Sequence, residues 1–254
     1  MKILRNMVMA LSMYTKLPMP RVEWKEENMK YMLFFFPLAG VLVGTVIVGL
    51  WFLFDLLGMG ILLKSALLAV IPLLLTGGIH MDGFMDTLDG LGSYGEKEKK
   101  LEIMKDPNTG AFAVIGYGIY LLVMFGLFAE VSDKTIVMVG IGYIYSRILS
   151  GLSVTMISCS KTSGLLYLFA STAQKEKVKI GLLIQGVLLE IFMLWFFFPQ
   201  AVVLIIGASI VFIYYWWMSK KNFGGITGDV AGFFLQLVEL VMAFCLVMGD
   251  KLWF

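Results

Sequence analysis

The chain has 254 residues with a net charge of +2, and 59% of its residues are hydrophobic, which gives a mean hydropathy of +0.88. Ordinary globular domains are about 45–50% apolar, so this composition excludes a typical water-soluble domain. The long apolar segments do not alternate with polar residues, as the strands of a membrane β-barrel do. We therefore expect an all-α fold, a polytopic transmembrane helical bundle that forms a single domain over residues 1–254.

Residues 1–30 form a basic N-terminal segment, and residues 3–14 have the pattern of a short amphipathic helix at the membrane interface. Pro18 and Pro20 stop this helix, since proline blocks its continuation. No small-residue cleavage site follows the apolar part of the segment, so we expect no removable signal peptide. Lys16 is either an interfacial lysine or a contact to a phosphate group of a ligand.

About seven membrane spans are expected, because seven apolar segments approach the length of about 20 residues that crosses a bilayer. They are residues 32–54, 61–79, 111–129, 135–157, 180–198, 200–219 and 231–249. In the first of them, Gly40 and Gly44 are spaced for the close packing of two helices. A polar connection over 80–110 follows the second span. Cys159 and Cys245 are too few and too far apart to indicate a disulfide or a metal site.

The distribution of Lys and Arg orients the bundle, because cytoplasmic loops carry an excess of basic residues. With the N-terminus in the cytoplasm, that side collects the basic residues of 1–30, 80–110 and 158–179, with Lys220 and Lys221. The other side holds only Lys64, Lys134 and Lys251. We therefore expect a multi-pass protein of the cytoplasmic (inner) membrane with a cytoplasmic N-terminus.

Three aspartates, Asp82, Asp86 and Asp89, follow the second span at a spacing that places them on one face of a helix. Carboxylates one helical turn apart, at ~6 Å and an effective dielectric constant of ~20, repel each other by roughly 3 kcal/mol. No basic residue lies between Lys64 and Lys97 to offset this repulsion. We expect a bound cation to do so, and ligands that are all oxygen favour Mg²⁺. The alternative is a solvated acidic helix end.

A second motif repeats the pattern of the first, because Gly224-Gly225 precedes Asp229 as Gly77-Gly78 precedes Asp82. Paired glycines let backbone N–H groups approach a ligand, and such arrangements suit anions. Both copies emerge on the cytoplasmic side. We therefore expect one active site at that face, in which Asp229 joins the metal ligands while the glycines and Thr227 bind substrate. Alternatively, the second copy is a hinge between two spans.

Four further side chains are candidates for catalysis beside Asp82. His80 is the only histidine, and it acts either as a general base near neutral pH or as a hydrogen-bonded supporting group. Lys105 and Asp106 either face the acidic stripe or belong to a simple turn. Arg147 lies inside a span, where a charge is costly, so we expect it to grip a phosphate or carboxylate group. Its alternatives are a structural ion pair with a motif aspartate and an approach to the interface.

Acidic metal ligands, glycine turns and scattered Lys and Arg at a membrane face fit group transfer at a diphosphate. The chain has no P-loop, no dinucleotide fingerprint and no basic helix for nucleic acid. Two other classes stay open. A transferase acting on prenyl or CDP-alcohol diphosphates would share the metal site, although the Ala-Arg pair of the latter type is missing after Asp82-Gly83. An ion-coupled transporter would use the aspartates and Arg147 as an ion path, although these acids cluster at span ends.

Three motifs combine to give a specific pattern. They are the stretch from Gly77 to Gly90, the Leu101-Glu102-Ile103-Met104-Lys105-Asp106 segment with Gly110-Ala111-Phe112, and Gly224-Gly225-x-Thr227-Gly228-Asp229. Together they resemble cobalamin synthase, the adenosylcobinamide-GDP ribazoletransferase family. The Thr15-Lys16-Leu17-Pro18-Met19-Pro20 segment resembles the opening of that family, which more often has arginine where Lys16 stands. The resemblance covers nearly the whole chain.

This resemblance implies an integral membrane Mg²⁺ enzyme of the late corrin pathway, whose partners are the lipid bilayer and small-molecule substrates. It would join adenosylcobinamide-GDP to α-ribazole or α-ribazole 5′-phosphate and release GMP. A ribazole hydroxyl would attack the phosphate next to the cobinamide arm, giving adenosylcobalamin or its 5′-phosphate. A homo-oligomer and a complex with other enzymes of the pathway both remain open.

Overall fold

The computed structural model describes residues 2–20, 29–160, 165–172 and 174–253. Regular structure in these residues is helical, apart from one isolated bridge between Cys159 and Ile226, so the all-α prediction is confirmed. The helices are α1 (Lys2–Tyr14), η1 (Leu33–Phe35), α3 (Pro37–Leu56), α4 (Ile61–Thr76), α5 (Ile79–Gly92), α6 (Lys97–Ile103), α7 (Ala111–Glu130), α8 (Asp133–Met156), α9 (Leu165–Thr172), α10 (Lys175–Phe196), α11 (Gln200–Phe223) and α12 (Gly228–Trp253). Arg21, Lys25 and Lys161, which the charge argument used, lie outside the described residues.

The expected membrane spans correspond to long apolar helices. Six stretches of the described chain are each long and apolar enough to cross a membrane, and the bent pair of α4 and α5 would make a seventh if it is one span. Helix α10 begins at Lys175 rather than at 180, and α11 continues to Phe223 rather than ending at 219. In both cases polar residues extend the helix beyond its apolar segment. The multi-pass character of the chain is therefore confirmed.

The polar connection over 80–110 is largely helical, and its first part is the helix that the spacing of the aspartates predicted. Gly77 adopts a left-handed conformation that ends α4, and α5 then starts at Ile79 with its axis bent by 97° from that of α4. The acidic stripe therefore lies on a helix of its own. Because α5 turns away and carries three aspartates, we take the apolar crossing to end with α4 and place α5 outside the membrane-spanning segments.

Helices α8 and α12 form the centre of the bundle. In α8, 78% of the apolar 18-residue stretch is buried inside the bundle, and in α12 the share is 72%. In the other four long spans the buried share is only 22% to 44%. Helix α3 packs on α8 through Gly40 and Gly44, where a Cβ atom would collide with the backbone of Tyr143 and Gly140, so the predicted close packing of these glycines is confirmed. Helix α10 lies at the outside, and its apolar side chains such as Ile184, Leu188 and Trp195 are exposed, as expected of a surface that faces lipid.

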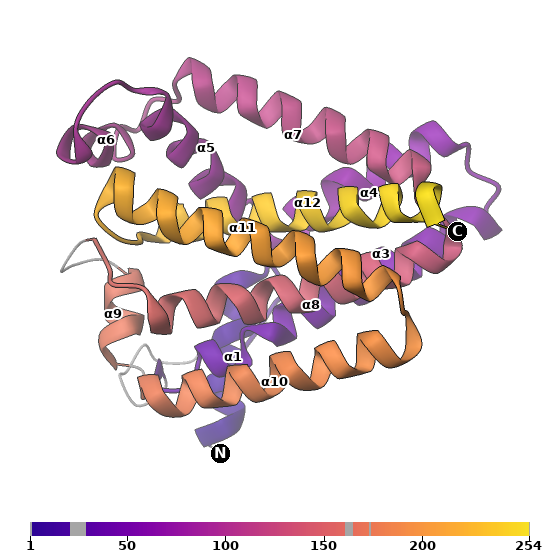
Figure 1. Cartoon of the computed structure of the whole chain (residues 1–254), viewed down its shortest axis with the longest axis horizontal. Helices are drawn as coiled ribbons and strands as arrows, with labels where there is room; N and C mark the ends of the chain where they lie inside the picture. The colour runs from indigo at the N-terminus through magenta and orange to yellow at the C-terminus, as the bar shows by residue number, and fades with distance from the viewer. Residues whose placement is uncertain (1, 21–28, 161–164, 173, 254) are drawn as a thin grey trace.

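The connections of the bundle gather at two opposite ends (Figure 1). At the left in the view lie α5, α6, α9 and the turn between α11 and α12, whereas the α3–α4, α7–α8 and α10–α11 connections and the C-terminus lie at the right. The two motifs that contain paired glycines therefore meet at the same end. Helix α6 and the α11–α12 turn, where several basic residues of the charge argument lie, are thus at one end of the bundle, and the side of the membrane that this end faces stays a prediction.

Candidate active site

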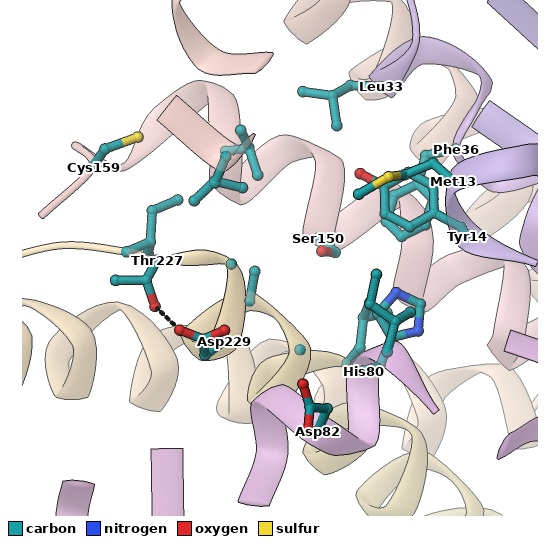
Figure 2. A pocket seen from close by; sticks show the side chains of 18 of the residues that line it. Met13, Tyr14, Leu33, Phe36, His80, Asp82, Ser150, Cys159, Thr227 and Asp229 are labelled. Atoms are coloured by element: carbon teal, nitrogen blue, oxygen red, sulfur yellow. Dashed lines mark hydrogen bonds between the residues drawn. The ribbon is translucent and has the colours of Figure 1, made fainter. Parts of the chain in front are cut away.

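A cavity of about 360 Å³ opens at the end of the bundle where the two motifs meet. Its walls come from α1, η1 and the residue before α3, α5, α8, α9 and the start of α12. Figure 2 shows Asp82 and Asp229 on one side of it and Met13, Tyr14 and Phe36 on the other, with His80 between Asp82 and Tyr14. The structure thus brings the aspartates of both sequence motifs to one cavity.

Two glycines let the motifs approach each other. A Cβ atom at Gly83 of α5 would lie 2.7 Å from the Cα atom of Asp229, and one at Gly232 of α12 would lie 2.8 Å from the carbonyl oxygen of His80. Such distances are closer than side-chain carbon atoms tolerate. Helices α5 and α12 therefore touch through their backbones, and this contact sets the separation of Asp82 and Asp229.

Replacement of Gly83 by alanine is expected to separate the two motifs. The added methyl group collides with the backbone of Asp229 and should cost about 1–3 kcal/mol of stability. A displacement of about 1 Å at a reactive centre can lower the rate about 100-fold, so activity should fall by at least tenfold. Gly118→Ala on α7 is the matched control, because no atom lies within 4 Å of the position that a Cβ atom would take there. Thermal unfolding and turnover of both variants test this, and a fully active Gly83→Ala enzyme would contradict the assigned contact.

The acidic stripe forms an electrostatically strained group. Burial, followed by the neighbouring carboxylates of Asp82, Asp229 and Asp89, raises the pKa of Asp86 to about 6. The repulsion expected from the sequence is therefore present in the fold. Asp229 accepts a hydrogen bond from the hydroxyl of Thr227 at 3.4 Å, and both residues line the cavity.

The stripe does not form a ready-made metal cage. Within the described part of the chain, no group of three or more His, Cys, Asp or Glu side chains is arranged to hold a metal ion. The donor chemistry nevertheless fits Mg²⁺, which is commonly held by one or two carboxylates together with water and substrate phosphates. Asp82, Asp86 and Asp229 meet this requirement, because they are close enough for their like charges to raise the pKa of Asp86.

Asp89 has a different task from the other acids. Its two carboxylate oxygens accept hydrogen bonds from the backbone N–H groups of Gly110 at 2.7 Å and Ala113 at 2.8 Å. These groups lie at the N-terminus of α7, where an acidic side chain satisfies donors that have no partner within the helix. The structure therefore gives Asp89 a capping role, and its oxygens are engaged without a metal.

The paired glycines also differ from their expected role. The N–H groups of Gly77 and Gly78 donate to the carbonyl oxygens of Leu74 and Leu73, which closes the end of α4. Gly224-Gly225 closes the end of α11 in the same way, with bonds to Lys220 and Ser219. All four glycines have positive φ angles, as this kind of helix ending requires. Their N–H groups serve helix capping, so the expectation that they face an anion was wrong.

Lys16, Lys105 and Asp106 lie outside the cavity wall. The side chain of Lys16 crosses Gly77, where a Cβ atom would collide with it, so the structure brings Lys16 to the first motif. Lys105 is exposed at the end of α6. Asp106 accepts hydrogen bonds from the backbone and side chain of Asn108, which lower its pKa and match the simple turn considered as the alternative. Neither Lys105 nor Asp106 lines the cavity.

His80 is at the cavity wall but is a poor proton acceptor. It is 5% exposed, it stacks on Tyr14 with ring centroids 5.8 Å apart, and neither ring nitrogen has a hydrogen-bond partner among the described residues. Burial, assisted by the charge of Arg147, lowers the pKa of His80 to about 3. A general base works best when its pKa lies near the working pH, so the geometry favours a positioning role for the neutral ring.

Arg147 is buried beside Glu239 in the interior of the bundle. The guanidinium group donates hydrogen bonds to the Glu239 carboxylate, to the Ser146 hydroxyl at 2.9 Å and to the Tyr143 carbonyl at 3.2 Å. Arg147 does not line the cavity. The structural ion pair considered for Arg147 is therefore present, but its partner is Glu239 of α12 rather than a motif aspartate.

Sequence reasoning missed several residues of this region. Glu239 had a visible signal, since an acid in an apolar span calls for a partner inside the bundle. Tyr14 of α1, Phe36 just before α3 and Ser150 of α8 line the cavity and had no comparable signal, because ordinary packing explains such residues equally well. Only the fold brings them to the two motifs.

Comparison with known proteins identifies relatives of this chain along nearly its whole length. The family model described as cobalamin-5-phosphate synthase matches residues 6–247. The adenosylcobinamide-GDP ribazoletransferase of Lachnoclostridium phytofermentans is 41% identical over 250 residues, which cover 98% of this chain and 96% of the relative. The proteins of the same name from Clostridium botulinum strain Eklund 17B and Treponema denticola are 40% and 32% identical, and they match 95% and 94% of this chain and 96% of their own lengths. No solved structure matches significantly.

Proposed function

The chain belongs to the cobalamin-5-phosphate synthase family, and from this premise we propose that it is an adenosylcobinamide-GDP ribazoletransferase. It joins adenosylcobinamide-GDP to α-ribazole or α-ribazole 5′-phosphate, and the products are adenosylcobalamin or its 5′-phosphate and GMP. The observation that carries this proposal is the meeting of Asp82 and Asp229 at one cavity, which unites the two motifs. A prenyl or CDP-alcohol transferase and a transporter have no such support from the relatives.

The reaction exchanges a phosphoanhydride bond for a phosphate ester bond. A hydroxyl oxygen of the nucleoside bonds to the phosphorus that bears the cobinamide arm, and the bond from that phosphorus to the bridging oxygen of GMP breaks. GMP leaves with this oxygen, and the hydroxyl proton passes to solvent. The side chains that bind the diphosphate lie on α5 and at the start of α12, so the α5–α12 contact positions the reacting groups.

The acidic side of the cavity holds the cofactor in this proposal. Mg²⁺ bound by Asp82, Asp86 and Asp229 would neutralise the negative charge that develops on the leaving phosphate. Thr227 orients Asp229 through its hydroxyl group. Lys16, which is exposed beside Gly77, supplies a positive charge for an outer phosphate oxygen.

We place the cavity at the cytoplasmic face of the membrane. The basic connections gather at the end of the bundle that contains the cavity, and cytoplasmic loops are the ones rich in Lys and Arg. Nucleotide and nucleoside substrates are water-soluble on that side. Labelling of single cysteines at Lys99 and Lys134 with a membrane-impermeant reagent tests the orientation, since only Lys134→Cys should react in intact cells.

Release of GMP is the direct test of the proposed reaction. Purified protein in detergent with Mg²⁺, adenosylcobinamide-GDP and α-ribazole should form GMP and the joined corrinoid in equal amounts, as measured by chromatography and mass spectrometry. Omission of α-ribazole should abolish GMP formation, which separates transfer from hydrolysis. Folded protein that yields no GMP with both forms of the acceptor would overturn the proposal.

A further inference from the structure

The cavity has two chemically different sides. Asp82, Thr227 and Asp229 make one side polar and acidic. The opposite side is apolar and aromatic, and there the rings of Tyr14 and Phe36 lie with their centroids 4.0 Å apart. Figure 2 shows Ser150 between these two sides. A ligand that fits the cavity therefore has a flat apolar part joined to a part that reaches the acids.

The size of the cavity restricts which substrate enters it. A volume of about 360 Å³ lies near the lower end of ordinary ligand pockets, which run from about 300 to 1,000 Å³. A benzimidazole nucleoside has about 20 non-hydrogen atoms and fills roughly 250 Å³, so it fits in such a pocket. A corrin ring with its side chains is several times larger than this volume, so the cavity does not enclose it whole.

Two hydroxyl groups at the cavity wall are available to a ligand. Tyr14 is 9% exposed and Ser150 is 3% exposed, both line the cavity, and neither hydroxyl makes a hydrogen bond to another described residue. Their oxygen atoms are not among the fully buried polar atoms that lack a partner, so they face the space of the cavity. The polar groups of a pocket fix the orientation of its ligand through hydrogen bonds. The two hydroxyls can therefore bond a few polar atoms of a ligand.

The polarity of the cavity separates the two nucleosides of the proposed reaction. Guanine presents donors and acceptors around its whole edge, and most of them would lack partners against Met13, Leu33 and Phe36. A dimethylated benzimidazole has a single bare ring nitrogen and an otherwise apolar edge. The aromatic side of the cavity thus matches the base of the acceptor rather than that of the donor.

On the basis of the proposed function, we propose that this cavity is the binding site for the acceptor nucleoside. Its benzimidazole base lies against Tyr14 and Phe36, and the hydroxyl groups of Tyr14 and Ser150 hydrogen-bond the nucleoside. The sugar points to Asp82 and Asp229, where its hydroxyl meets the diphosphate. The corrin part of the donor then approaches from outside the cavity, so the two substrates have separate binding determinants.

Separate Michaelis constants for the two substrates test this assignment. Tyr14→Phe and Ser150→Ala each remove one hydrogen bond, so each should raise the KM for α-ribazole about three- to tenfold, while the KM for adenosylcobinamide-GDP stays unchanged. Tyr120→Phe is the matched control, because Tyr120 is buried on α7 and does not line the cavity. Saturation-transfer NMR of α-ribazole without the donor measures binding directly. It uses only the monodisperse protein of each variant, so a variant that folds less well can still be compared with the wild type.

Each result of these measurements is informative. A rise in the KM for adenosylcobinamide-GDP alone would assign the cavity to the donor and overturn the inference. If the wild-type enzyme releases GMP but both variants keep their Michaelis constants and their NMR transfer unchanged, the inference is overturned. The proposed function is intact in that case. A folded wild-type protein that releases no GMP would overturn the proposed function and this inference with it.

Discussion

Replacement of Asp82 or Asp86 by asparagine should reduce kcat/KM by about 1,000-fold or more while the protein stays folded. Metal-assisted charge neutralisation supplies several kcal/mol, and about 1.4 kcal/mol corresponds to a factor of ten in rate. Asp86→Asn should also leave the melting temperature unchanged or raise it, because it removes a charge that its neighbours repel. Turnover across a Mg²⁺ titration, together with thermal unfolding in detergent, provides the measurement.

Two further variants are compared with Asp82→Asn and Asp86→Asn. Glu98→Gln removes an exposed negative charge on α6, at the same end of the bundle, and should leave the rate unchanged. Asp89→Ala removes the cap of α7 and should cost about 0.5–2 kcal/mol of stability. Near-normal rates of Asp82→Asn and Asp86→Asn at saturating Mg²⁺ would show that these acids hold no essential metal.

Separation of Arg147 from Glu239 is expected to have the largest effect on stability. Glu239→Gln leaves a buried positive charge without a counter-ion, and removal of one partner of a buried pair typically costs about 3–5 kcal/mol. The double variant Arg147→Met/Glu239→Leu has neither charge and should recover most of this loss. Unfolding in detergent of the two single variants and the double variant measures the coupling between the residues.

The same set of variants decides between the two roles of Arg147. If the pair is structural, the double variant should recover GMP release together with its stability. A double variant that is folded but inactive would instead support the grip on a substrate phosphate that the sequence suggested. Glu130→Gln is the control, since the pair of Glu130 and Lys251 is about half exposed and should contribute less than about 1 kcal/mol.

The local pattern of the sequence was sufficient for much of the fold. Apolar length predicted the spans, and Gly40 and Gly44 correctly indicated a close helix contact, because both signals depend on a few neighbouring residues. The bend after α4 was missed. Its signal, the Gly77-Gly78 pair, was interpreted as an anion site, although paired glycines with left-handed conformations end helices equally well.

The candidate site could be predicted only in part for a related reason. The spacing of Asp82 and Asp86 revealed their shared helix face, whereas the capping of α7 by Asp89 depends on a contact with residues beyond the next helix. The partner of Arg147 lies 92 residues away, and α10 offers a second acid, Glu190, inside another span. Without the packing of α8 against α12, nothing in the sequence selects between these two acids.

The pairing of Arg147 with Glu239 also imposes an order on the biosynthesis of this protein. The 92 residues between them take roughly 5–20 s to translate at about 5–20 residues per second. For part of that interval α8 has left the ribosome while its counter-charge does not yet exist, and an arginine at the centre of an inserting helix costs about 2.5–3.5 kcal/mol at the translocon. A chain that stops before α12 therefore leaves the arginine of α8 without its counter-charge.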